Sequence, residues 1–367
     1  MKSFKVPLHA PVVTEEDMKA VADAMQTGWI APGGPYVEYF EEELKRFSGM
    51  PSVVALSSGT AALHLALKAA GVGRGDYVIV PTHTYVATVS PIMYQGASPV
   101  FIESEPETLN MSPEYLTKAL ETLSRKGIRP KAVIPVHIYG FPAKIKEIVS
   151  IAKRYGLVVI EDAAEALGAE YEGQPVGTFG DFGVFSFNGN KIITTSGGGA
   201  LLLKNPALEP KIRFWASHAK ENKPWFYHTD TGYNYQMSNI LAALGWSQMQ
   251  RLQEILRKKK EIYTLYNIYM QNTTCKLHIL PGKFQANYWL NIAWCEGKKS
   301  AREIIKILHE EKVEARHLWF PLHLMPVFSK YMYFGNSETQ EFFYRGILLP
   351  SGLNIVKETL LFIKRIF

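Results

Sequence analysis

The residues with the clearest chemical potential are a lysine and an aspartate that each follow an apolar, strand-like run. Lys191 follows the run Val184–Phe187, and Asp162 follows the run Leu157–Ile160. A lysine amine can form a Schiff base with an aldehyde, and a carboxylate can keep a pyridine nitrogen protonated. Pyridoxal phosphate (PLP) chemistry requires both groups, so the pair predicts a PLP enzyme in which Lys191 and Asp162 are catalytic.

The phosphate of such a cofactor needs hydrogen-bond donors, and Ser58, Gly59 and Thr60 offer them. They follow a strand-like run and open a helical pattern, so Gly59 lets backbone amides approach an anion and Thr60 adds a hydroxyl. Ser186, on the run before Lys191, supplies a second hydroxyl. The alternative is an ordinary helix N-cap with Ser58 or Thr60 as the capping residue.

Two further side chains are candidates to border the cofactor ring. Tyr85 can stack on a pyridine ring, or it can be a core aromatic that packs on the sheet. Glu165 lies shortly after Asp162 and shares its face if a helix begins there. It would then approach the phenolic oxygen of the cofactor, where repulsion predicts a raised pKa. The alternative is a glutamate on a helix surface.

Short apolar runs alternate with amphipathic stretches between about residues 50 and 204. This rhythm predicts an α/β fold with a mostly parallel sheet that is covered on both faces and binds ligands beyond the carboxyl ends of its strands. From about 238 to 272 apolar residues recur at helical spacing, and shorter strand-like and helical stretches follow. We therefore expect a large domain at 1–237, a long connecting helix at 238–272 and a small C-terminal α+β domain at 273–367.

Composition favours a globular protein. The chain has 367 residues, of which 47% are hydrophobic and 20% charged, so it can bury a large core. No secretory signal or membrane-length apolar stretch is visible, and we expect a cytoplasmic protein without membrane contact. Cys275 and Cys295 lack metal-ligand spacing and are expected to be reduced, and no metal site is expected. The net charge of +6 suits an anionic substrate, and the basic run 257–260 is interpreted as a solvated helix face rather than a nucleic-acid site.

Taken in order along the chain, these motifs resemble those of the DegT-type sugar-nucleotide aminotransferases of PLP fold type I. The similarity rests on residues 58–60, 135–140, 161–165, 186–191 and 232–235, and it continues through 28–30, 314–316, Trp319 and 349–352. It implies a large domain with a seven-stranded-type sheet, PLP as cofactor, and amino transfer from L-glutamate to a nucleotide-linked keto sugar. Lys191 would anchor the cofactor and then move the proton between the cofactor and substrate carbons.

The resemblance also implies a homodimer with active sites at the subunit interface. Asn234 of one subunit would reach the phosphate bound in the other subunit's site. The implied cofactor-binding residues are Gly59, Thr60, Tyr85, Asp162, Glu165, Ser186, Lys191 and Asn234. The implied substrate-binding residues are Trp29, Ile30, Asn188, His218, Arg316 and Trp319.

The stretch Asn188–Asn190 resembles the subgroup that aminates carbon 4 of 4-keto-6-deoxyhexoses, which includes GDP-perosamine synthases and UDP-linked enzymes. The stretches 196–199 and 218–221 favour a UDP-linked 4-keto-6-deoxy-N-acetylhexosamine, and the alternative is GDP-4-keto-6-deoxymannose. Lysine rather than histidine at 191 disfavours a sugar deoxygenase, and its presence also argues against a non-catalytic sugar-nucleotide-binding relative. Gln236, His317 and Phe320 stand where relatives usually carry arginine, proline and lysine, so contacts to the anionic nucleotide are expected to differ.

Overall fold

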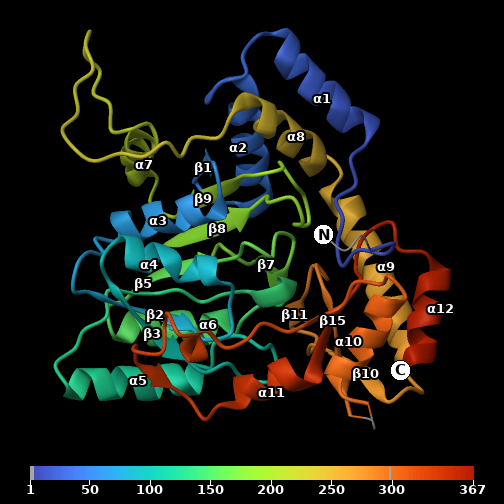
Figure 1. The fold of residues 1–367 in the computed structure, drawn as a ribbon. Helices are drawn as coiled ribbons and strands as arrows, with labels where there is room; N and C mark the ends of the chain where they lie inside the picture. The colour runs from blue at the N-terminus through green and yellow to red at the C-terminus, as the bar shows by residue number, and fades with distance from the viewer. Residues whose placement is uncertain (1–3, 297–298) are drawn as a thin grey trace.

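The computed structural model describes residues 4–296 and 299–367, and its central feature is an eight-stranded sheet (Figure 1). Only β9 runs antiparallel to its neighbours within this sheet, and the remaining pairs are parallel. The strands in spatial order are β1 (Ser52–Leu56), β9 (Gly199–Leu203), β8 (Phe182–Ser186), β5 (Val158–Asp162), β4 (Ala132–Val133), β2 (Tyr77–Pro81), β3 (Ser98–Ile102) and β14 (Tyr333–Phe334). The first seven confirm the expected mostly parallel sheet, and β14 adds an eighth strand from the C-terminal part.

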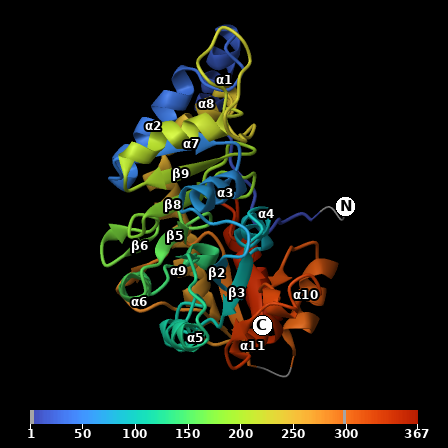
Figure 2. The same ribbon diagram turned by 90° about the vertical axis from the view of Figure 1, so that its left-hand side faces the viewer.

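Both faces of the sheet are buried, as the near-continuous apolar runs predict. On β1, Val53 and Ala55 pack into one core cluster while Val54 and Leu56 pack into another. Helices lie on both sides of the strands, with α3 (Gly59–Ala69) and α4 (Ser90–Tyr94) on one side and α6 (Ile145–Arg154) on the other (Figure 2). The carboxyl ends of all strands except β9 therefore lie at one edge of this sheet.

The second sheet has four antiparallel strands. It contains β10 (Cys275–Leu277), β12 (Asn291–Cys295), β15 (Gly346–Leu349) and β13 (Arg316–His317) in that order. A small third sheet contains β11 (Phe284–Gln285), β6 (Glu170–Tyr171) and β7 (Gln174–Pro175). Cys275 and Cys295 face each other across β10 and β12 as free, buried thiols with their sulfur atoms 3.4 Å apart.

The remaining helices cover the sheets and the ends of the molecule. They are α1 (Glu15–Gln26), α2 (Pro35–Ser48), α5 (Pro113–Arg125), α7 (Glu209–Ala216), α8 (Asn239–Met249), α9 (Leu252–Met270), α10 (Ala301–Glu310), α11 (Glu338–Arg345) and α12 (Lys357–Ile366). Short 3₁₀ turns lie at η1 (Val86–Thr88), η2 (Ile138–Gly140), η3 (Pro206–Leu208) and η4 (Leu322–Leu324). No helix in this described part of the chain has the length and apolar character needed to span a bilayer.

The single long helix expected at 238–272 is wrong in one respect, because α8 and α9 are separate helices. The chain breaks at Arg251, whose guanidinium donates to the Val12 carbonyl at 2.8 Å and pairs with Asp17 at 2.5 Å. In the basic run on α9, Arg257, Lys258 and Lys260 are exposed as expected, and Arg257 forms a surface ion pair with Glu261. Lys259 differs from the expectation because it is buried.

The N-terminal segment is hydrogen-bonded to residues that flank β13 and β15 of the four-stranded sheet. The amides of Lys5 and Val6 donate to the Lys312 carbonyl, and the Ser351 amide donates to the Leu8 carbonyl at 2.7 Å. The N-terminal segment thus contacts the four-stranded sheet, and β14 joins the C-terminal part of the chain to the large sheet. The division into domains at 1–237, 238–272 and 273–367 therefore stays a proposal.

Candidate active site

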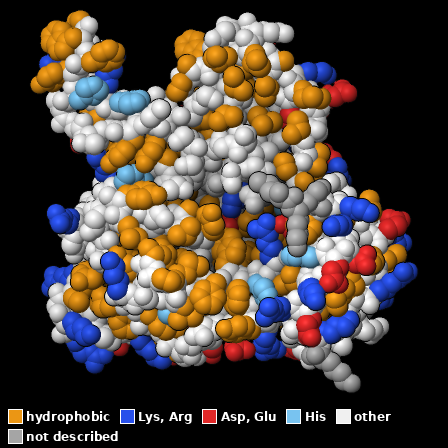
Figure 3. Space-filling view, in the orientation of Figure 1, with side chains coloured by type: hydrophobic (Ala, Val, Ile, Leu, Met, Phe, Trp, Pro, Cys, Tyr) orange, Lys and Arg blue, Asp and Glu red, His pale blue; other side chains and the backbone are white. Residues whose placement is uncertain are grey.

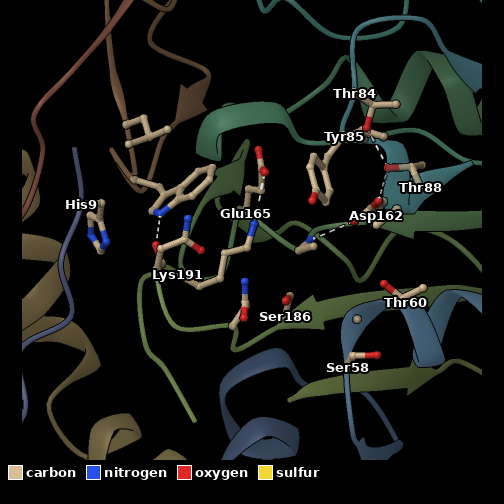
Figure 4. Close-up of a pocket in the computed structure, with 18 of the residues that line it drawn as sticks. His9, Ser58, Thr60, Thr84, Tyr85, Thr88, Asp162, Glu165, Ser186 and Lys191 are labelled. Carbon is tan, nitrogen blue, oxygen red and sulfur yellow. Dashed lines mark hydrogen bonds and ion pairs between the residues drawn. The ribbon is translucent and has the colours of Figure 1, made fainter. Parts of the chain in front are cut away.

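A cavity of about 600 Å³ opens at the carboxyl edge of the large sheet. Its walls come from the loops that follow β1, β2, β5 and β8, and from the N-terminal and C-terminal parts of the chain. Figure 4 shows the side chains of Ser58, Thr60, Tyr85, Thr88, Asp162, Glu165, Ser186 and Lys191 around it. Ligands in open α/β sheets bind at this edge, so these residues meet where the fold predicts a site.

Ser58, Gly59 and Thr60 form the start of α3. Ser58 has an extended backbone, and its hydroxyl accepts a hydrogen bond from the Ala61 amide at 3.0 Å, so it is the N-cap. The first amides of a helix have no partner within it and favour anions through the helix dipole. A Cβ at Gly59 would come within 3.1 Å of Ser186 Cβ, so glycine lets the turn approach that strand. Both interpretations of this turn therefore hold: Ser58 caps the helix, and Gly59, Thr60 and Ser186 line the cavity.

Asp162 ends β5 and carries a buried carboxylate on the cavity wall. Its Oδ2 atom accepts a hydrogen bond from Thr88 Oγ1 at 2.7 Å, and Oδ1 accepts one from the Ala164 amide at 3.1 Å. The Thr84 hydroxyl is 2.7 Å from Thr88 Oγ1 and is the donor in that pair, since Thr88 donates to Asp162. Burial raises the pKa of Asp162, and the hydrogen bonds from Thr88 and Ala164 oppose that rise.

Lys191 and Glu165 form an ion pair inside the cavity. Lys191 Nζ lies 3.2 Å from Glu165 Oε1, and Glu165 Oε2 accepts a hydrogen bond from the Tyr139 amide at 2.8 Å. The chain after Asp162 forms turns rather than a helix, so the interpretation of Glu165 as a helix-surface residue is wrong. Burial raises the pKa of Glu165, and the Lys191 ammonium opposes that rise.

The turn that carries Lys191 is fixed from two sides. The Lys191 amide donates to the Asn188 carbonyl at 2.9 Å, and the Trp289 indole N–H donates to the Asn190 carbonyl at 2.6 Å. Trp289 lies just before β12, and its ring centroid is 4.3 Å from Lys191 Nζ. No local sequence pattern marks Trp289, so it was not among the candidates drawn from the sequence.

Two aromatic side chains, Tyr85 and Trp319, line another part of the cavity wall. The Tyr85 side chain is 58% exposed, which excludes the core-aromatic interpretation, and its ring lies 5.4 Å from that of Trp319. The Trp319 amide donates to Tyr139 Oη at 2.8 Å, and the Trp319 and Tyr139 rings are 5.1 Å apart. Tyr85 therefore presents an exposed aromatic face on which a planar ring can stack.

Three of the substrate candidates, Asn188, Arg316 and Trp319, line the same cavity. Arg316 Nε donates to Glu314 Oε1 at 2.9 Å, and Glu314 Oε2 accepts a hydrogen bond from the Leu8 amide at 2.8 Å. The N-terminal segment thus orients the carboxylate that in turn orients Arg316.

Four other candidates lie outside the cavity lining. Asn234, Trp29 and Ile30 are exposed, and the His218 amide donates to the Tyr233 carbonyl at 2.9 Å. The residue after Asn234 nevertheless contacts the edge of the cavity, because the amide of Ser57, which lines the cavity, donates to the Tyr235 carbonyl at 2.8 Å. The structure therefore does not bring these four residues together with Lys191 within one chain.

His9 is a cavity residue that sequence reasoning missed. Neither of its ring nitrogens has a hydrogen-bond partner among residues 4–296 and 299–367. Burial lowers the pKa of His9 well below its usual value, and the ammonium groups of Lys259 and Lys191 act in the same direction. In that described range, no group of three or more His, Cys, Asp or Glu side chains could hold a metal ion.

The residues present fit pyridoxal phosphate. The start of α3 with Thr60 and Ser186 suits the phosphate, Tyr85 suits a stacked ring, and Asp162 suits a protonated ring nitrogen. Lys191 provides the amine that the aldehyde needs. Glycine at position 59 lets the start of α3 lie close to Ser186, because a Cβ there would come within 3.1 Å of Ser186 Cβ.

Comparison with known proteins agrees with this fit. Residues 11–364 match the DegT/DnrJ/EryC1/StrS aminotransferase family. The chain belongs to this family. It is 44% identical to EpsN of Bacillus subtilis (strain 168), named as a pyridoxal phosphate-dependent aminotransferase, over 96% of this chain and 92% of EpsN. It is 34% identical to the GDP-perosamine synthase of Escherichia coli O157:H7, over 98% of this chain and 96% of that enzyme.

A solved structure shows the same fold with the cofactor named. The PLP form of the sugar aminotransferase Spr1654 from Streptococcus pneumoniae matches with a TM-score of 0.88 and 27% identity, covering 99% of this chain and 97% of that one. These findings confirm the fold class, the family and the cofactor expected from the motifs. This member of the DegT family is a PLP-dependent sugar aminotransferase.

Proposed function

We propose that this aminotransferase moves an amino group from L-glutamate to carbon 4 of a UDP-linked 4-keto-6-deoxy-N-acetylhexosamine. The observation that carries the proposal is that the stretch resembling the carbon-4 subgroup, Asn188–Asn190, and the stretch favouring a UDP-linked sugar, Ser196–Gly199, border one cavity. They do so through Asn188, Asn190, Gly197 and Gly198. The second candidate is the same reaction on GDP-4-keto-6-deoxymannose. The similarity to the Escherichia coli GDP-perosamine synthase favours that candidate.

Bound PLP supplies an aldehyde that exchanges amines and a ring that accepts electrons from the substrate carbon. Asp162 would hold the proton on the ring nitrogen, and Thr88 and Ala164 keep its carboxylate in place. Lys191 Nζ would move a proton between the substrate carbon and the cofactor carbon, as a general acid and base. Glu165 Oε1, at 3.2 Å, holds that amine in the cavity.

The nucleotide would bind toward Arg316. Its side chain is 67% exposed at the cavity wall, and Glu314 fixes the orientation of the guanidinium. Guanidinium groups bind phosphate oxygens well because they present several donors in one plane. His317 and Phe320, two of the residues that depart from relatives, pack against Phe343 instead of lining the cavity.

We also propose that the enzyme works as a homodimer in which Asn234 serves the partner's phosphate site. The loop between α7 and α8 projects from the molecule and carries exposed apolar side chains (Figure 1 and Figure 3). Trp225 and Phe226 on this loop are 61% and 81% exposed, and Trp29 is 53% exposed. Large exposed apolar groups of this kind mark protein interfaces, and a second copy of the chain would cover them.

A substrate panel tests the reaction. The PLP-loaded enzyme is incubated with L-glutamate and either UDP-linked or GDP-linked 4-keto-6-deoxy sugars, and the amino-sugar product and 2-oxoglutarate are quantified. We expect a higher kcat/KM for the UDP-linked N-acetylated sugar. Turnover of the GDP-linked sugar alone would instead establish the second candidate, and turnover of neither would refute both.

A further inference from the structure

Two groups hold the Lys191 amine in the structure, and only one of them is a carboxylate. Glu165 Oε1 lies 3.2 Å from Nζ, and the face of the Trp289 ring lies 4.3 Å from the same atom. An ammonium over an indole face is attracted by the ring quadrupole, and tryptophan is the strongest partner of this kind. Trp289 is therefore placed to act on the amine itself.

Trp289 is held from three directions. Its indole N–H donates to the Asn190 carbonyl at 2.6 Å, its amide donates to Asn287 Oδ1 at 2.8 Å, and its carbonyl accepts from Lys259 Nζ at 3.0 Å. The residue is only 3% exposed. The ring consequently has little freedom to leave Lys191.

The same loop also fixes Glu165. Asn287 Nδ2 donates to the carbonyl oxygens of Glu165 and Leu167 at 2.8 and 3.0 Å. Lys259, buried on α9, connects this loop to the end of β15 because its ammonium also donates to the Ser351 carbonyl. One loop before β12 thus sets both partners of the Lys191 amine.

We propose that Trp289 is a positioning residue that, together with Glu165, holds the free Lys191 amine in the orientation from which it transfers a proton. This inference rests on the proposed acid and base role of Lys191. The cation–π contact holds the amine while it is protonated, between taking up the proton and delivering it. The N–H···O bond to Asn190 fixes the turn that carries the amine.

Two variants of Trp289 separate the contribution of the ring face from that of the indole N–H. Trp289→Leu removes the ring face and the N–H, and Trp289→Phe keeps a ring but removes the N–H. Trp294→Phe is the matched control, since Trp294 lies on β12 outside the cavity and its indole N–H donates to His278 Nδ1 at 2.9 Å. Trp289→Met, with a flexible side chain of intermediate bulk, replaces the leucine variant if that protein does not fold.

The first measurement is the glutamate half-reaction of the PLP-loaded enzyme, followed in a single turnover with glutamate carrying hydrogen or deuterium on its α-carbon. For Trp289→Leu we expect a rate loss of about tenfold with a larger isotope effect, because proton transfer becomes more limiting. Affinity for PLP should change by less than about twofold, since the phosphate and ring contacts are intact. Trp289→Phe should lose less, and Trp294→Phe should match wild type.

The second measurement needs no amino donor. The rate of PLP uptake by the cofactor-free enzyme is recorded against pH, since only an uncharged amine adds to the aldehyde. Removing the ring face should move the half-maximal rate to lower pH by up to about one unit. Glu165, Asp162 and His9 also face the amine and are unchanged in every variant.

The outcomes are distinct. An unchanged isotope effect and an unchanged uptake profile in Trp289→Leu would overturn the inference, even if the rate falls through a structural effect. If the wild type does not react with glutamate, the proposed donor is wrong, and the uptake profile alone decides the role of Trp289.

Discussion

Thr88 Oγ1 donates a hydrogen bond of 2.7 Å to Asp162 Oδ2. Both side chains are buried. Thr88 lies in the turn η1 and Asp162 at the end of β5, far apart in the sequence. Burial alone favours the neutral acid, whereas a donated hydrogen bond favours the charged carboxylate. Thr88 therefore helps Asp162 to remain the anion that a protonated ring nitrogen requires.

Thr88→Val should lower turnover because it removes this donor without changing the shape of the side chain. A hydrogen bond to a charged group contributes about 1.5 to 3 kcal/mol, so we expect a loss of about 10- to 100-fold in kcat. Thr88→Ser keeps the hydroxyl and should recover most of the activity. Equal kcat values for the valine and serine variants would show that the hydroxyl does not support Asp162.

Asp162→Asn should reduce the rate at least about tenfold, because an amide cannot hold the ring nitrogen in its protonated form. The melting temperature and the bound PLP content are measured alongside kcat to exclude misfolding. Turnover at the wild-type rate would mean that another group is the partner of the ring nitrogen.

Lys191→Ala and Asn234→Ala test the shared active site of the proposed homodimer. Each variant alone should be folded but nearly inactive. After mixed refolding, random pairing would give heterodimers with one complete site, and activity should return to about a quarter of the wild-type value. If Asn234 serves its own subunit's site, mixing restores nothing.

His278 should make the protein sensitive to acid. Burial lowers the pKa of His278 from 6.5 to about 4, so the unfolded chain binds a proton at a pH where the folded chain does not. Stability is then lost as the pH falls from 6.5 toward 4, by about 3 kcal/mol for this group. In His278→Gln the free energy of unfolding, measured in urea at several pH values, should be lower at pH 7 and depend less on pH in this range. If the free energy of unfolding falls equally with pH in the wild type and in His278→Gln, then His278 is not the source of the acid sensitivity.

The centre of the candidate site could be predicted because its residues follow strands with strong local patterns. Lys191, Asp162 and Gly59 each come after an apolar run, and parallel strands bring their carboxyl ends to one edge. The position of each side chain relative to its own strand was sufficient to place it.

The rest of the site depends on contacts between distant segments. Trp289 contacts the turn that carries Lys191, and the Leu8 amide donates to Glu314. Neither contact leaves a periodic pattern in the local sequence, so neither residue was predicted to belong to the site. At the break between α8 and α9, Arg251 forms a tertiary ion pair with Asp17, a contact that no local pattern encodes either. Asn234 and Trp29 were assigned by resemblance, and one subunit alone leaves them outside the cavity.

The strand β14 has a practical consequence for anyone who wishes to shorten this polypeptide. It pairs with β3 at Tyr333 and Phe334 and closes that border of the large sheet. A truncated gene ending after α9 would omit it and leave the backbone groups of β3 without their neighbour. Unpaired borders of this kind recruit strands from other molecules, so such a fragment is expected to precipitate during expression rather than yield a usable minimal enzyme.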